Sequence, residues 1–187
     1  EKGNSYGFVG PNGCGKSVFF KTLCGYSLLT EGQVIYRGKI IGKEQDFIDD
    51  AGIVIEEPEF INSLSGLENL KILAEIQKKI SEAEIIEVLK QFDLYEDRNK
   101  KVGKYSVGMK QKLRLAQAVM EKPQVLILDE PMNGLDKKSV KKVEDILKAF
   151  VENGGTLLMT SHIEQQVEAC CKIVYEIDGG EILRVTD

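Results

Sequence analysis

Eight residues near the start of the chain form a glycine-rich loop whose chemistry suits a phosphate group. Its glycines let successive backbone N–H groups turn toward one anion, and the following helix adds its positive end. Lys16 is expected to reach the β- and γ-phosphates of a nucleotide, and Ser17 to offer its hydroxyl to Mg²⁺. The alternative is a glycine turn that merely caps a helix, but the full GxxxxGKS spacing between a strand and a helix favours phosphate binding. The expected nucleotide contacts are Gly10, Pro11, Asn12, Gly13, Cys14, Gly15, Lys16, Ser17 and Val18.

Two neighbouring acids follow a short apolar run much later in the chain. Val125–Leu128 suits a strand buried on both faces, and Asp129 and Glu130 come directly after it. Ligands bind at the carboxyl ends of parallel strands, so these carboxylates are expected near the glycine loop. Asp129 is predicted to hold Mg²⁺, largely through water, and Glu130 to orient or activate an attacking water. The alternative is a pair of solvated acids at a strand end.

Three further positions have side chains or backbone groups that could act on a phosphate. His162, the only histidine, follows the predicted strand Thr156–Thr160, where a purely structural role is the alternative. Ser106 is a natural helix cap, and the predicted helix Gly108–Met120 would direct free N–H groups at an anion. Asp136 is expected to cap the helix that follows it.

Strands that alternate with helices predict an α/β fold, with a mostly parallel sheet flanked by helices. Short apolar runs bounded by turn residues predict strands, and apolar residues spaced by three or four predict helices. The predicted helices of the core are Lys16–Cys24 and Val140–Val151. The predicted strands are Tyr6–Val9, Gln33–Tyr36, Gly52–Ile55, Val125–Leu128, Thr156–Thr160 and Ile173–Ile177.

The middle of the chain has a different pattern. Residues 67–92 show two apolar helical stripes and no convincing strand, and Ser81 with Glu84 predicts a capping box at the second helix. We therefore expect a single domain over residues 1–187, with a core of 1–56 and 112–187 and a helical subdomain at 57–111.

Composition narrows the class of protein further. The formal charge of −5 argues against bulk attraction to nucleic acid or an anionic membrane, so a phosphate site must be local. No apolar run is long enough to cross a bilayer, and the first residues lack the apolar stretch of a secretory signal. The four cysteines show no metal or redox spacing, which favours reduced cytosolic thiols.

The order of these motifs resembles the nucleotide-binding domain of ABC ATPases. In that family Tyr105-Ser106-Val107-Gly108-Met109 corresponds to the Leu-Ser-Gly-Gly-Gln signature. The resemblance implies ATP and Mg²⁺ as cofactors, with Lys16, Glu130 and His162 as catalytic residues. It implies that Ser106, Gly108 and Asp136 act across the interface of a homodimer or of a dimer with a related ABC ATPase subunit. A membrane-spanning permease would be the other partner, with no nucleic acid and no direct membrane insertion, at the cytoplasmic face of the membrane.

The chain departs from the family pattern at several places. Val107 and Met109 replace a glycine and a glutamine of the signature, and Glu56 stands where the family usually has glutamine. The resemblance implies that Glu56 approaches Mg²⁺, the nucleotide and the attacking water. The segment 56–60 resembles the group that exports lantibiotic or bacitracin-type peptides, and an acidic surface turn is the alternative. The family's adenine-stacking aromatic, which lies upstream of the glycine loop, is expected to be absent from this chain.

Together these observations predict an ATP-hydrolysing subunit of an ABC transporter that dimerises around ATP and drives a separate permease, as an exporter. Two alternatives stay open. One is a non-transport ABC ATPase that works on ribosomes or DNA. The other is a nucleotide-gated regulatory module with weak hydrolysis.

Overall fold

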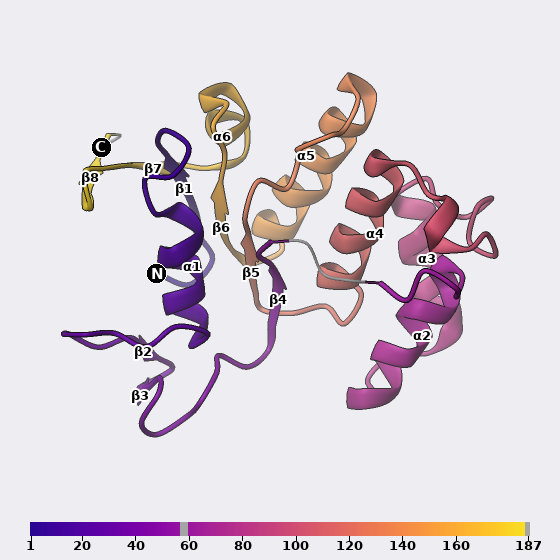
Figure 1. Ribbon diagram of the computed structural model, residues 1–187, viewed down its shortest axis with the longest axis horizontal. Helices are drawn as coiled ribbons and strands as arrows, with labels where there is room; N and C mark the ends of the chain where they lie inside the picture. The colour runs from indigo at the N-terminus through magenta and orange to yellow at the C-terminus, as the bar shows by residue number, and fades with distance from the viewer. Residues whose placement is uncertain (57–59, 186–187) are drawn as a thin grey trace.

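The computed structural model describes residues 1–56 and 60–185, and its centre is one mixed sheet (Figure 1). Within these residues the strand order is β4-β5-β6-β1-β7-β8. All neighbours pair in parallel except β7 and β8, which are antiparallel. This confirms the predicted α/β fold. The strands are β1 Ser5–Val9, β4 Ala51–Val54, β5 Val125–Leu128, β6 Thr156–Thr160, β7 Ile173–Asp178 and β8 Glu181–Arg184.

Helices cover both faces of the sheet because the central strands are apolar on both sides. In β5, Ile127 belongs to the core on the α1 side, whereas Leu126 and Leu128 belong to the core under α4, α5 and α6. Such a continuous apolar run is typical of a strand buried between two helical layers. The helices are α1 Lys16–Cys24, α4 Val107–Val119, α5 Lys137–Glu152 and α6 Glu164–Cys170.

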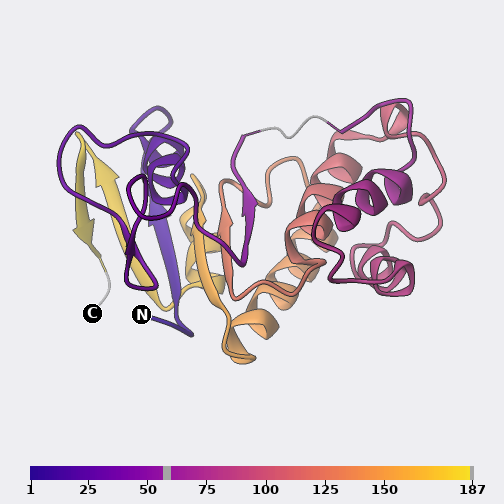
Figure 2. The same cartoon turned by 90° about the horizontal axis from the view of Figure 1, so that it is seen from below.

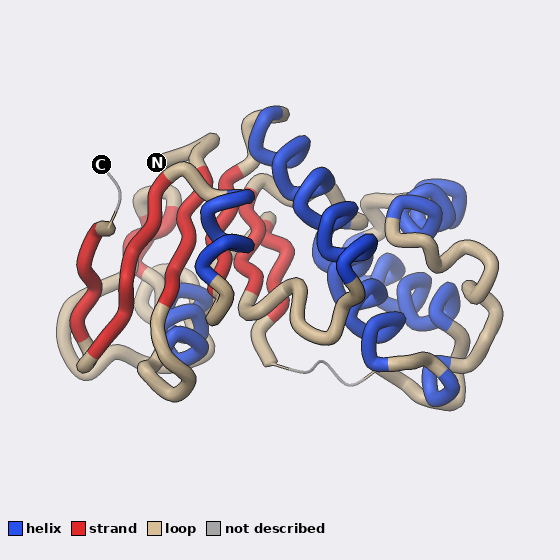
Figure 3. Tube along the Cα trace, turned by 90° about the horizontal axis from the view of Figure 1, so that it is seen from above, coloured by secondary structure: helices blue, strands red, loops and turns tan. Residues whose placement is uncertain are grey.

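The helical region lies beyond the β4 edge of the sheet, at the opposite end from β8 (Figures 1 and 3). Its helices are α2 Gly66–Gln77 and α3 Glu82–Gln91, followed by a short 3-10 helix at Val102–Lys104. The predicted capping box of Ser81 and Glu84 is confirmed, and Ser65 forms a second one with Glu68. Buried side chains of this region share one core cluster with the sheet, and α4 packs against both α3 and β4. Residues 57–59 lie outside the described part, and the division at 57–111 stays a prediction.

Several elements differ from the sequence prediction. The strand expected at Gln33–Tyr36 is reduced to β2, Ile35–Tyr36, which pairs only with β3, Lys39–Ile40, in a separate small sheet. Glycines on either side restrict this segment to a short hairpin, and its side chains are partly or fully exposed. The elements β3, β8 and α6 were not predicted, and α4 begins at Val107 rather than Gly108.

Both ends of the described chain lie in the half of the molecule that contains β1, β7 and β8, away from the helical region (Figure 2). Within residues 1–56 and 60–185, no helix combines the length and the apolar character that a membrane span requires.

Candidate active site

The glycine loop joins β1 to α1, as its sequence predicts. Gly10 has a φ of 155°, and a Cβ atom at this position would come within 2.3 Å of the carbonyl oxygen of Ile177 on β7. Only glycine fits where two backbones approach this closely. The loop is thereby held against the sheet, and its tip, Pro11 to Gly13, remains exposed to solvent.

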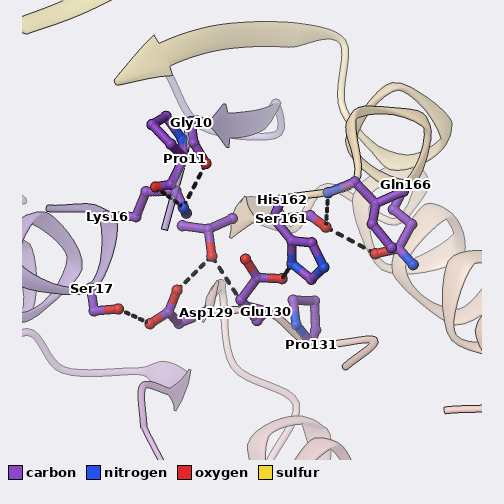
Figure 4. A network of polar contacts seen from close by, with 12 residues as sticks. Gly10, Pro11, Lys16, Ser17, Asp129, Glu130, Pro131, Ser161, His162 and Gln166 are labelled. Carbon is purple, nitrogen blue, oxygen red and sulfur yellow. Dashed lines mark hydrogen bonds and ion pairs between the residues drawn. The ribbon is translucent and has the colours of Figure 1, made fainter. Parts of the chain in front are cut away.

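Lys16 begins α1 and is 6% exposed, which is unusual for a lysine. Its Nζ donates to the carbonyl oxygens of Gly10 at 2.8 Å and Pro11 at 3.0 Å (Figure 4). The ammonium group is therefore held inside the curve of the loop by its backbone carbonyls. A phosphate bound there would meet a positive charge that is already in position.

A chain of hydrogen bonds connects the loop to the ends of β5 and β6 (Figure 4). The Ser17 hydroxyl donates to Asp129 Oδ2 at 2.5 Å. The Thr160 hydroxyl donates to Asp129 Oδ1, also at 2.5 Å, and accepts from the Glu130 N–H at 3.0 Å. The predicted metal-binding pair, Ser17 and Asp129, is thus in direct contact.

Besides Thr160, the backbone conformation of Glu130 and two further side chains hold this residue in place. Its φ is 49°, a left-handed value that is uncommon for residues other than glycine. Its Oε2 lies 2.9 Å from Nδ1 of His162, so the predicted catalytic pair is also in contact. Gln111, a buried residue of α4, donates from Nε2 to the carbonyl oxygen of Pro131 at 2.8 Å and to that of Glu130 at 3.4 Å.

A pocket of about 190 Å³ lies where the loop faces these acids. It is lined by Asn12, Gly13, Gly15, Lys16, Ser17, Val18, Asp129 and Glu130. A larger cavity of about 680 Å³, between α1, the sheet and β2, contains none of the predicted site residues. All the lining residues of the smaller pocket are thus among the predicted site residues, although the larger cavity offers more room.

Glu56 lies just after β4, in a left-handed conformation with a φ of 59°. Its carboxylate forms an ion pair with Lys21 of α1 and does not line the 190 Å³ pocket. In this state Glu56 is therefore occupied by a neighbouring helix, and its expected role at the metal and nucleotide stays a prediction.

The signature residues and Asp136 are not among the residues that line that pocket. Ser106 is exposed, and its side chain accepts from the N–H of Met109 to cap α4. Asp136 caps α5 by accepting from the N–H and hydroxyl of Ser139, and these hydrogen bonds lower the pKa of its carboxyl. Both capping predictions are confirmed, while the proposed contacts across a dimer stay predictions.

The signature loop contacts the turn before α5 within the chain. A Cβ atom on Gly108 would lie 3.1 Å from the carbonyl oxygen of Gly134, and one on Gly134 would lie 2.9 Å from Cγ1 of Val107. Gly134, with a φ of 73°, leaves the space that the Val107 side chain fills. The departure at Val107 is thus accommodated by a neighbouring glycine.

Thr160, Gln111 and Lys21 were not predicted as site residues. Thr160 was assigned only to a strand, although a hydroxyl at the end of a buried strand beside an Asp-Glu pair is a detectable signal. Gln111 and Lys21 belong to helices, and their partners become visible only from the three-dimensional arrangement.

The mostly parallel sheet, the phosphate loop between β1 and α1, and the Ser17–Asp129 pair define the class of P-loop NTPases. The profile of the family described as ABC transporter matches residues 1–133. The chain therefore belongs to the ABC transporter family. This confirms the family resemblance and identifies the chain as an ATP-binding cassette with ATPase activity.

Curated relatives agree with this assignment. The uncharacterized ABC transporter ATP-binding protein YybJ of Bacillus subtilis is 37% identical over 97% of this chain and 84% of its own length. The lantibiotic transport ATP-binding protein SrtF of Streptococcus pyogenes is 34% identical over 97% of this chain and 78% of its own length. The bacitracin transport ATP-binding protein BcrA of Enterococcus faecalis is 34% identical over 97% of this chain. Proteins of the two predicted antibiotic classes are thus among the relatives.

Some relatives are longer than this chain. It spans 60% of the length of BcrA, and 61%, 59% and 60% of three further Bacillus subtilis ATP-binding proteins. Among solved structures, the ATP-binding cassette MJ0796, a dimeric post-hydrolysis state bound to ADP and Pi, matches all of this chain and 88% of its own. The TM-score is 0.87 at 22% identity, a likeness that confirms the fold.

Proposed function

We propose that this chain is the ATP-hydrolysing subunit of an exporter of antimicrobial peptides or of a drug-resistance type. The observation that carries the catalytic part is the hydrogen-bonded series from Ser17 through Asp129 to Glu130 and His162, which faces the lysine of the phosphate loop. The exporter class is supported by the relatives SrtF and BcrA, whose names assign them to lantibiotic and bacitracin transport.

Mg²⁺ fits the site in combination with a nucleotide. Among the described residues, no group of three or more His, Cys, Asp or Glu side chains is arranged to hold a metal ion by itself. Ser17 and Asp129 nevertheless present a hydroxyl and a carboxylate side by side at the phosphate pocket. Mg²⁺ prefers a few protein oxygens together with phosphate oxygens and water, which is the set that this pair and ATP would supply. When bound, the ion would neutralise charge on the β- and γ-phosphates.

The protein's own residues would position the phosphate and the attacking water. Lys16 would exchange its loop carbonyls for γ-phosphate oxygens and stabilise their negative charge. Glu130 would hold a water opposite the bond to the leaving oxygen and accept its proton as oxygen attacks phosphorus. The bond from the γ-phosphorus to the β-phosphate oxygen then breaks, and ADP and phosphate are the products. His162, 2.9 Å from Glu130 Oε2, would fix the direction of that carboxylate.

Two chains would complete each nucleotide site. The start of α4 carries free N–H groups and the positive end of a helix dipole, and both favour a phosphate. Ser106 and Val107 are exposed there, and neither they nor Gly108 line the phosphate pocket of their own chain. A second copy, or a related ABC ATPase subunit, would therefore supply Ser106, Gly108 and the turn at Asp136 to the opposite ATP.

When two chains close around ATP, the cassette would transmit this movement to a separate permease at the inner face of the membrane. The helical region beyond β4 is the proposed docking element, since Glu56 lies where the core passes into it. The division into a core of 1–56 and 112–187 and a helical subdomain of 57–111 belongs to this proposal. Cargo specificity would be determined by the permease.

The hydrolytic role is tested by replacing Glu130 with glutamine, which keeps the shape and removes the base. We expect steady-state phosphate release to fall roughly 10²–10⁴-fold, the usual contribution of general acid–base catalysis, with ATP binding retained. Turnover at the wild-type rate in Glu130→Gln would contradict the assignment. Low release in the wild type, alone and with the permease, would instead favour a nucleotide-gated regulatory module.

A further inference from the structure

Thr160 occupies a central place in the site without belonging to any of its motifs. It ends β6, is 0% exposed, and its single hydroxyl contacts both Asp129 and Glu130. The parallel pairing of Leu128 with Met159 fixes this arrangement, because it places the residue after each of them side by side. The position of Thr160 therefore follows from the register of the sheet.

The donor and the acceptor in each of these two hydrogen bonds follow from the groups that take part. A backbone N–H can only donate, so the Glu130 N–H must use a lone pair of the Thr160 oxygen. The hydroxyl hydrogen is then left for Asp129 Oδ1 at 2.5 Å, so Thr160 donates to this carboxylate. One buried group thus holds the side chain of one acid and the backbone of the next.

The Ser17 contact with Asp129 differs in this respect. Ser17 is itself assigned to the metal ion, so its hydroxyl is not expected to stay on Asp129 Oδ2 once Mg²⁺ and nucleotide are bound. Thr160 approaches Oδ1 from the protein interior, where it does not compete with the ligand. Thr160 also carries two heavy atoms on Cβ, which restrict its side chain to few rotamers.

We infer that Thr160 is a positioning residue that aligns the metal-binding carboxylate of Asp129 with the left-handed turn that directs Glu130. This inference rests on the proposed roles of Asp129 and Glu130. Hydrogen-bond partners behind a metal ligand commonly change metal affinity or activity 10–100-fold when they are removed. We expect an effect of about that size on both properties here.

The test replaces Thr160 with valine, which keeps the shape and removes the hydroxyl, and with serine, which keeps the hydroxyl. Thr156→Val is the matched control, because Thr156 is a buried residue of the same strand whose hydroxyl accepts from the Gly3 N–H at 2.9 Å, far along the strand from the site. Calorimetry measures the Kd for ADP with Mg²⁺ and with chelator, and phosphate release gives kcat and KM.

For Thr160→Val we expect the gain in ADP affinity due to Mg²⁺ and the kcat each to fall roughly 10–100-fold, with Mg²⁺-free ADP binding within about twofold of wild type. Thr160→Ser is expected to recover most of both losses, and Thr156→Val to behave as wild type. Unchanged values in a folded Thr160→Val chain, or equal losses in Thr160→Ser, would overturn the inference.

If Thr160→Val does not fold, Thr160→Cys replaces it, because a thiol fills similar space but is a weak donor. The same losses are expected there, and wild-type values would again overturn the inference. Failure of the proposed function would give a different result from failure of this inference. In that case the wild type itself would show no Mg²⁺-dependent nucleotide binding and no phosphate release.

Discussion

At the scale of single residues, the chemistry depends on groups that are held in place before any ligand arrives. Lys16 is bound by two loop carbonyls, Asp129 by two hydroxyls, and Glu130 by His162. Groups that are already oriented stabilise developing charge without the cost of reorganisation. Nucleotide binding therefore exchanges one set of partners for another within a fixed frame.

Replacing Lys16 with alanine tests the phosphate loop at this scale. The phosphate of ATP would lose its ammonium partner, and removal of one member of such a pair costs about 2–5 kcal/mol. We expect the affinity for ATP to fall at least about 30-fold. Equilibrium binding of a fluorescent ATP analogue measures this change. An affinity equal to that of the wild type would remove the loop from its assigned role.

Much of this site was predictable from residue types and spacing. The structure brings Ser17 of the loop into contact with Asp129, and His162 into contact with Glu130. Thr160 was not identified, because its contacts depend on which residues of β5 and β6 face each other. Lys21 was missed for a similar reason, since its pairing with Glu56 requires knowledge of how α1 approaches β4.

At the scale of elements, boundaries were predictable where burial or capping is strong. The apolar runs of β5 and β6 predicted both ends of each strand, and the capping box of Ser81 predicted the start of α3. The antiparallel strand β8 is exposed along its whole length, so it lacks the alternation that reveals a half-buried strand. The helix α6 has seven residues and no side-chain cap, which leaves little local signal in the sequence.

An ion pair also connects the start of α3 to the segment after α4. Glu84 accepts from Nζ of Lys122, beyond the end of α4, at 2.7 Å and from the N–H of Ser81 at 3.0 Å. The Lys122 hydrogen bond, followed by those from Ser81, lowers the pKa of Glu84 to about 2. A carboxyl whose pKa is depressed in the folded state stabilises the fold above its unfolded pKa, and this stabilisation is lost as the pH falls.

For Glu84 the relevant window runs from a pH near 4.5 downward toward 2. We expect the urea midpoint of unfolding to fall less between about pH 5 and about pH 3 in Glu84→Gln than in the wild type. This interval spans the usual pKa of a carboxyl. Lys122→Met should have a similar effect, and the double variant should not add the two. An unchanged pH dependence in both single variants would show that the contact contributes nothing.

At the scale of the whole molecule, the residues of the proposed two-chain site form two groups, and the signature group does not line the phosphate pocket of its own chain. The phosphate pocket is lined by residues of the loop and of the β5 end, whereas Ser106 and Val107 are exposed at the start of α4. Contacts of Val107 and Gly108 with Gly134 join the signature loop to the turn before α5. A second chain that approached the start of α4 would therefore meet the signature loop and the turn before α5 together.

The most direct test of this two-chain site is the molar mass of the Glu130→Gln chain with ATP and Mg²⁺, measured by size-exclusion chromatography with light scattering. Without its base the chain should keep ATP intact, and we predict a nucleotide-dependent dimer of twice the 20.9 kDa chain mass. Adding Ser106→Arg should leave ATP binding intact and the chain monomeric. A Glu130→Gln chain that binds ATP yet stays at the monomer mass would contradict the account.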